Sequence, residues 1–291
     1  MRPRNTTWLR TALAVAAAAV MLAQLTPASA ADKGTVTIAY VEWDSCVAGT
    51  DMVKYALEDA GYKVKTESVS AALMYEGLAN NDVDAMVCAW LPKVHAAYYA
   101  KTKDRLDNLG PNMANTRIGL VVPDYVTIDS IADLAKPGIA KKFDNRIVGI
   151  DPGAGIMEAT DKAIPAYKLP EKLVSGSDAT MTAVLGNEIR QKKWVVVTGW
   201  TPHWMWSRWQ LKFLDDPKDI YGKPGSVDTL VRKGLKKDMP QAWAILNRFH
   251  RTDKDTDAIM DAGERKGASI HEAAKKWVEA HPQQVNEWLG K

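Results

Sequence analysis

The segment VDAMVCAWLP, residues 83–92, is an almost uninterrupted apolar run that ends in Trp-x-Pro. Its short length, after a turn rich in Asn and Asp, predicts a buried strand over 83–89 that leads into Trp90. The periodicity before it predicts strands over 35–41 and 62–69 and helices over 47–60 and near 71–79. These residues therefore predict one βαβαβ unit.

A second segment, WVVVTGWTP at residues 194–202, repeats this ending. The elements predicted before it are a strand over 147–150, a helix after Gly155, a short strand near 173–176 and a helix over 179–192. The spacing agrees as well, since Trp43 to Trp90 is 47 positions and Asp151 to Trp200 is 49. The sequence thus predicts two similar α/β lobes, each a mostly parallel sheet flanked by helices, with their tryptophan-bearing strand ends at a cleft.

Two segments are predicted to lie between the lobes and are candidates for crossing strands, IGLVVPDYV from Ile118 and LKFLDDP from Leu211. The residues after them, 218–291, are rich in helical periodicity and are predicted to return and cover the first lobe. The first lobe is therefore predicted to comprise 31–122 with 218–291, and the second 123–217. Two crossing segments imply a hinge.

The first thirty residues have the layout of a secretory signal. Three arginines precede an apolar run over 12–25, and Ala28-Ser29-Ala30 ends it with small residues. The apolar run is shorter than the roughly 20 residues that a membrane span needs, so a cleaved signal peptide is favoured over an anchor. Because no cysteine lies near the cleavage site, a lipid anchor is not expected, and the mature chain is predicted to be periplasmic.

Removal of residues 1–30 changes the charge balance. The whole chain has 38 Lys and Arg against 35 Asp and Glu, and the signal carries three arginines and no acid, which leaves 35 against 35. A neutral mature chain without a clustered basic segment does not fit a nucleic-acid partner.

Aromatic usage is lopsided, with 11 Trp and only 3 Phe. A quaternary ammonium has no N–H to donate, so its attractive partners are dispersion and the faces of aromatic rings, of which indole is the strongest. Each ring contributes roughly 0.5 to 2 kcal/mol when desolvated. Trp43, Trp90 and Trp200 all follow predicted strands and are candidates for such a cage, although a tryptophan at a strand end often only packs.

The glycine-rich turn GIDPGAGIM, residues 149–157, follows a predicted strand and opens a predicted helix. Exposed amides at a helix start suit an anion, although a purely structural turn has the same composition. His95, at the end of LPKVH, is a candidate donor to the same anion, or a solvated histidine at a helix start.

Other reactive residue types give no enzyme signature. His203 is accompanied by no serine nucleophile motif, and the His and acidic residues show no zinc spacing, so neither a metal nor a cofactor is expected. Cys46 and Cys88 match no metal motif. They could form one disulfide in an oxidising compartment or remain two buried thiols.

The sequence resembles the glycine betaine and proline betaine binding proteins of ABC osmoprotectant importers. The motifs that carry the resemblance span nearly the whole mature chain: AYVEWD from Ala39, AWLPKVH from Ala89, IGLVVPDY from Ile118, GIDPGAGIM from Gly149, VVTGWTPHWMW from Val196, LKFLDDP from Leu211 and RKGLKKDMP from Arg232. The resemblance implies a two-lobe periplasmic binding protein fold, type II-like, with two crossing segments, and a monomer that delivers its ligand to a permease driven by an ATPase.

The resemblance also implies a site. The methylated nitrogen would lie among Trp43, Trp90 and Trp200, and the carboxylate would meet the amides of Gly155 and Ile156 together with His95. Glycine betaine is the ligand most favoured. Choline, carnitine or dimethylsulfoniopropionate remain alternatives within the family, and a periplasmic enzyme or a receptor-sensing module is the alternative outside it.

Overall fold

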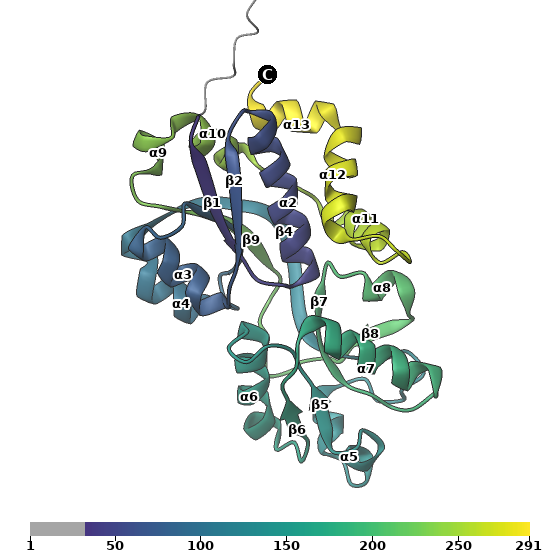
Figure 1. Cartoon of the computed structure of the whole chain (residues 1–291). Coiled ribbons are helices and arrows are strands. Elements are labelled where there is room, and N and C mark those ends of the chain that lie inside the picture. The colour runs from purple at the N-terminus through teal and green to yellow at the C-terminus, as the bar shows by residue number, and fades with distance from the viewer. Residues whose placement is uncertain (1–32) are drawn as a thin grey trace, which may run out of the picture. The chain divides into compact units, whose positions relative to one another are not determined.

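The computed structural model describes residues 33–291, so the predicted signal peptide lies outside the described residues (Figure 1). Within residues 33–291, no helix is both long enough and apolar enough to cross a bilayer.

The first βαβαβ unit forms as predicted. Its strands and helices are β1 (Thr35–Tyr40), α2 (Asp44–Asp59), β2 (Lys63–Ser68), α3 (Ala71–Asn80) and β3 (Ala85–Leu91). β1 pairs in parallel with β2 on one side and with β3 on the other. All seven residues of β3 are buried, which explains why this strand is an apolar run without alternation.

The second unit also forms, with shorter strands. Its elements are β5 (Arg146–Val148), α6 (Gly155–Tyr167), β6 (Lys172–Val174), α7 (Asp178–Arg190) and β7 (Val197–Thr201). β5 pairs in parallel with β6 and with β7. Ser177 caps α7 by accepting from the Thr180 N–H at 3.2 Å, which fixes where this helix starts.

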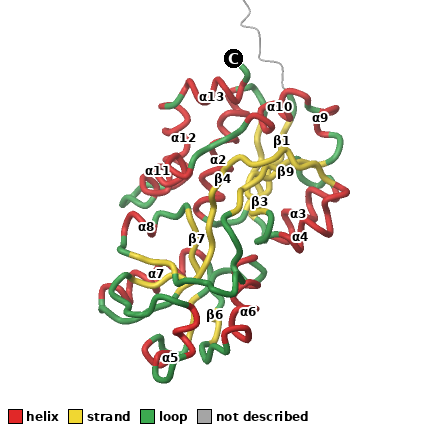
Figure 2. The backbone as a smooth tube through the Cα atoms, turned by 180° about the vertical axis from the view of Figure 1, so that it is seen from behind, coloured by secondary structure: helices red, strands yellow, loops and turns green. Residues whose placement is uncertain are grey.

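One long strand, β4 (Leu106–Pro123), joins the units. It pairs antiparallel with β9 (Gly225–Arg232), which also pairs antiparallel with β3. The segment from Leu211, predicted as a second crossing strand, does not cross, because its strand pairs with the end of β4 at Val121–Pro123. The order is β2-β1-β3-β9-β4-β7-β5-β6, with β8 (Leu211–Phe213) paired to β4. Figure 2 shows β4 running from the first group of strands towards β7.

The crossing takes place inside β4. Its pairing with β9 ends at Thr116, and its pairing with β7 begins at Arg117. We call the strands β2, β1, β3, β9 and the first part of β4, with their helices, the first lobe, and the remaining strands with theirs the second lobe. The residue limits predicted from the sequence, 31–122 with 218–291 and 123–217, stay a prediction.

β9 is an element that the sequence did not reveal, because residues 218–291 look helical as a whole. Asp228 and Thr229 are buried in the middle of this strand and interrupt its apolar pattern. The Asp228 carboxylate accepts from Asn108 Nδ2 at 2.9 Å and from Ser226 Oγ at 2.6 Å, which satisfies it inside the sheet.

Most of the other helices in residues 33–291 lie on the first lobe, as predicted for its C-terminal part. They are α4 (Ala96–Thr102), η1 (Lys103–Arg105), α9 (Leu235–Asp238), α10 (Pro240–Arg248), α11 (Asp253–Gly263), α12 (Ile270–Ala280) and α13 (Pro282–Leu289). Proline at the first position starts α10 and α13. The second lobe has η2 (Ile131–Ala135), α5 (Ile139–Lys142) and α8 (Met205–Arg208).

Cys46 and Cys88 form a disulfide whose Cα atoms are 5.5 Å apart. The bond ties the first turn of α2 to the last part of β3.

Candidate ligand-binding site

One pocket gathers residues from both lobes. It contains about 310 Å³ of space that no protein atom fills, part of which is open to solvent. Its wall contains all six residues that the sequence singled out, together with four others: Trp43, Trp90, Val94, His95, Ile118, Ile150, Ala154, Gly155, Ile156 and Trp200.

The three tryptophans reach the pocket from three element ends. Trp90 is the sixth residue of β3, Trp200 the fourth residue of β7, and Trp43 the residue that precedes α2. Each is at most 6% exposed. The indole nitrogens of Trp90 and Trp200 have no hydrogen-bond partner among residues 33–291, whereas that of Trp43 donates to Asp151 Oδ2 at 3.0 Å. The structure thus brings three indoles from separate elements to one apolar cavity.

His95 is fully buried in this wall, so burial lowers its pKa to about 3 and the ring is neutral. Its Nδ1 accepts a hydrogen bond from the Trp90 backbone N–H at 3.2 Å and therefore bears no proton. The proton must then be on Nε2, which is buried without a partner among the described residues. The alternative of a solvated histidine at a helix start is wrong here, because His95 presents an unused N–H donor at the pocket.

Gly155 and Ile156 are the first two residues of α6. The first N–H groups of a helix have no acceptor within it, and the positive end of the helix dipole lies there. Ala154, which precedes them, provides no side-chain cap. The turn GIDPGAGIM therefore places two amides that have no acceptor within α6 at the pocket that His95 also lines.

The two lobes approach closely at this turn. A Cβ atom on Gly155 would lie 2.0 Å from the carbonyl oxygen of Val94, a residue of the first lobe. Next to it, the hydroxyl of Tyr98 in α4 donates to the Gly153 carbonyl at 2.6 Å. Glycine at position 155 is thus required for the lobes to meet in this way.

Sequence reasoning missed the residues that only tertiary contact reveals. Val94 lies in a motif between two predicted site residues, and Ile118 begins a segment predicted only as a crossing strand. Ile150, Asp151 and Ala154 belong to the glycine-rich turn, for which the sequence predicted a role of the backbone amides only. Their position inside quoted motifs was the one available signal.

A largely apolar pocket that residues of two α/β lobes line together is the arrangement of a solute-binding protein of the two-lobe class. The family model described as "Substrate binding domain of ABC-type glycine betaine transport system" matches residues 34–280. The chain belongs to this family, which confirms the predicted family, the predicted fold class and the prediction that it is not an enzyme.

Two curated relatives illustrate the match. The glycine betaine/carnitine transport binding protein GbuC of Listeria monocytogenes is 44% identical over 157 residues, which are 53% of this chain and 52% of that protein. The chain thus spans about half the length of this relative. A glycine betaine/proline betaine-binding periplasmic protein of Salmonella typhimurium is 26% identical over 280 residues, covering 82% of this chain and 84% of the relative.

Solved structures agree over most of the fold. Lactococcal OpuAC, in a closed conformation complexed with glycine betaine, is 39% identical with a TM-score of 0.82 and covers 88% of this chain and 99% of that one. The glycine/betaine/L-proline-binding protein ProX of Borrelia burgdorferi is 37% identical with a TM-score of 0.84, covering 87% and 96%.

Proposed function

We propose that this protein captures glycine betaine between its lobes and delivers it to the permease and ATPase of an ABC importer. The observation that supports the proposal is the lining of one pocket, which combines three indole rings with His95 and the first two residues of α6. Three indole rings, Trp43, Trp90 and Trp200, suit a methylated cation without N–H groups. Three unpaired donors, His95 Nε2 and the amides of Gly155 and Ile156, suit a carboxylate.

A zwitterion satisfies both ends, whereas a plain cation does not. Choline has no carboxylate, so it would leave the buried Nε2–H of His95 without an acceptor, which is costly. Carnitine carries both groups and is the second candidate ligand, because the Listeria relative is named for glycine betaine and carnitine.

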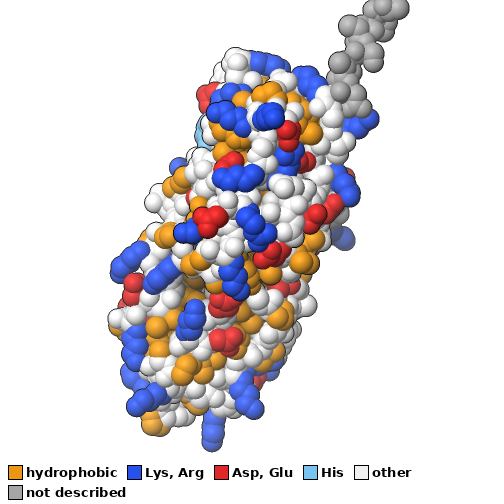
Figure 3. All heavy atoms as spheres, turned by 90° about the vertical axis from the view of Figure 1, so that its left-hand side faces the viewer, with side chains coloured by type: hydrophobic (Ala, Val, Ile, Leu, Met, Phe, Trp, Pro, Cys, Tyr) orange, Lys and Arg blue, Asp and Glu red, His pale blue; other side chains and the backbone are white. Residues whose placement is uncertain are grey.

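The proposal includes a place of action. The mature chain, cleaved after Ala30, would act in the periplasm as a monomer, and the Salmonella relative is named as a periplasmic protein. Basic and acidic side chains are interspersed over the face shown in Figure 3, which suits a freely diffusing carrier better than a nucleic-acid binder.

Calorimetric titration of the mature protein with glycine betaine, proline betaine, carnitine and choline tests this function. We expect glycine betaine to bind at least tenfold more tightly than choline, since an unpaired buried donor costs about 1 to 3 kcal/mol. Equal affinity for both, or no heat with any of the four ligands, would contradict the proposal.

A further inference from the structure

The start of helix α2 has no side-chain cap of its own. Trp43 occupies the N-cap position, and its side chain accepts no hydrogen bond from the helix. Instead, the carboxylate of Asp178, the first residue of α7 in the second lobe, accepts from the Asp44 N–H at 3.2 Å. The positive end of α2 is thus capped by a carboxylate from the other lobe.

Two more hydrogen bonds from the second lobe reach the same dipeptide. Trp43 Nε1 donates to Asp151 Oδ2 at 3.0 Å, and Trp204 Nε1 donates to Asp44 Oδ2 at 2.6 Å. Asp151, the acceptor, lies on the glycine-rich turn of the second lobe, and Trp204, the donor, lies on the loop after β7. Three separate contacts therefore converge on Trp43 and Asp44.

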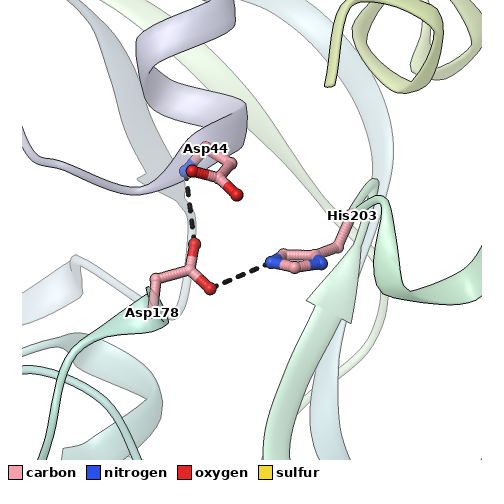
Figure 4. A group of neighbouring side chains, drawn as sticks. All are labelled: Asp44, Asp178 and His203. Carbon is pink, nitrogen blue, oxygen red and sulfur yellow. Dashed lines mark hydrogen bonds and ion pairs between the residues drawn. The ribbon is translucent and has the colours of Figure 1, made fainter. Parts of the chain in front are cut away.

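His203 holds the carboxylate that caps α2. Figure 4 shows Asp178 bonded to both Asp44 and His203. Its Nδ1 accepts the Met205 N–H at 3.1 Å, so the proton lies on Nε2, which donates to Asp178 Oδ1 at 3.0 Å. His203 and Asp178 are at most 2% exposed. The cap is thus held in a fixed orientation by a buried partner.

We propose that Asp151, Asp178 and Trp204 are positioning residues that grip the Trp43–Asp44 dipeptide when the lobes close; we call this set of five the latch. The latch acts through Trp43, because the hydrogen bond that its indole N–H donates to Asp151 fixes the rotation of a ring that lines the pocket. The inference rests on the proposed function in one respect, that Trp43 contacts the ligand. The latch makes that ring complete its part of the site only in the closed state.

Charge gives the latch a pH dependence. The charged and titratable side chains that surround Asp44 come from both lobes: Asp178, Arg190, His203, Arg208, Asp257 and Glu264. Burial, reinforced by the neighbouring Asp178 carboxylate, raises the pKa of Asp44 to about 6. Burial opposes the charged ring of His203, yet Asp178 outweighs it and raises the pKa of His203.

The sign follows from linkage. When the lobes separate, Asp44 returns to water and loses Asp178 as a neighbour, so its pKa falls towards the ordinary carboxylate value. Closing therefore takes up a proton at Asp44. The stabilisation of the closed state is fully present below the open-state pKa and is lost as the pH rises through about 6. Affinity should be about tenfold higher at pH 5 than at pH 7.5.

The test is calorimetric titration with glycine betaine of the wild type, Asp151→Ala, Asp151→Asn and Trp204→Phe. Asp151→Ala should weaken binding about tenfold, since a buried indole N–H loses its acceptor. Asp151→Asn keeps an acceptor oxygen and should recover most of the affinity. Trp204→Phe keeps the ring and the pocket intact and should weaken binding roughly fivefold by removing one hydrogen bond to a carboxylate. Asp161→Ala, at an exposed carboxylate of α6, is the matched control.

The readouts separate this inference from the proposed function. Thermal unfolding without ligand should not change in any variant, because the latch exists only between closed lobes. The Asp44→Asn variant should flatten the difference between pH 5 and pH 7.5. A wild type that binds no quaternary ammonium ligand defeats the proposed function. Two results with a wild type that binds glycine betaine would overturn the latch. One is an affinity of Asp151→Ala and Trp204→Phe within twofold of the wild type. The other is an Asp44→Asn variant that keeps the full affinity difference between pH 5 and pH 7.5. Equal losses in Asp151→Ala and Asp151→Asn also overturn it.

Discussion

In the proposed site, the pocket has two ends that differ in what they demand of a ligand. The tryptophan end offers ring faces, whose attraction grows with contact and has no single geometry that must be met. The donor end offers three N–H groups, of which the His95 Nε2–H is buried without a partner among residues 33–291. An unmet donor is costly, so this end excludes ligands as much as it attracts them.

Each end also draws on both lobes. Trp43 and Trp90 come from the first lobe and Trp200 from the second, whereas His95 comes from the first and Gly155 with Ile156 from the second. In the proposed function, neither end is complete until the lobes close, so closure and recognition would be one event at both ends. Substitutions at each end can measure its contribution to affinity.

The largest effect is expected from Gly155→Ala, which adds a Cβ atom 2.0 Å from the Val94 carbonyl oxygen. The clash is between lobes and not within α6, where alanine is a good helix former. Glycine betaine affinity should therefore fall by more than about 100-fold, as expected for a backbone clash in the closed state, while the apo unfolding temperature stays the same. Calorimetry and thermal unfolding check both parts, and Gly77→Ala in α3 is the control. A variant that binds normally would show that the lobes need not meet at this turn.

Trp90→Ala should have the next largest effect and test the cation end alone. Removal of one ring costs its cation–π attraction and its apolar contact, so affinity should fall about 30- to 100-fold. Trp90→Phe keeps a weaker ring and should lose roughly fivefold. Titration with glycine betaine measures the series, and Trp243→Ala in α10, outside the pocket, is its control. If alanine and phenylalanine were equally weak, the ring face would not be the attractive group.

His95→Ala should have the smallest effect and act on the donor end. Loss of the Nε2–H donor should weaken glycine betaine about tenfold. Choline has no carboxylate for this donor, so its affinity should change much less, and the preference for glycine betaine should shrink. The ratio of the two affinities is the measurement, because any loss of fold stability affects both ligands alike. An unchanged ratio would remove His95 from carboxylate recognition.

Local patterns in the sequence predicted much of this architecture. Both βαβαβ units could be read because buried parallel strands such as β3 are apolar runs and their helices have helical spacing. β9 could not be predicted from the sequence, because Asp228 and Thr229 are polar and gain their partners only inside the sheet. The six site residues predicted from motifs all line the pocket.

Contacts between the lobes lay beyond sequence reasoning. Asp178 looks like an ordinary first-turn acid of α7, and only the structure shows that it caps a different helix, α2. Nothing in the local sequence indicates that the indole nitrogen of Trp204 meets Asp44. Such pairs are far apart in the chain and have no period or spacing to reveal them.

The disulfide between Cys46 and Cys88 bears on when the protein becomes competent. Cys46 follows Trp43 by three residues, and Cys88 precedes Trp90 by two, so one covalent bond braces two of the three rings. In the proposed function, reduction of this bond is therefore expected to loosen the spacing of two cage rings and to weaken ligand binding more than it changes secondary structure.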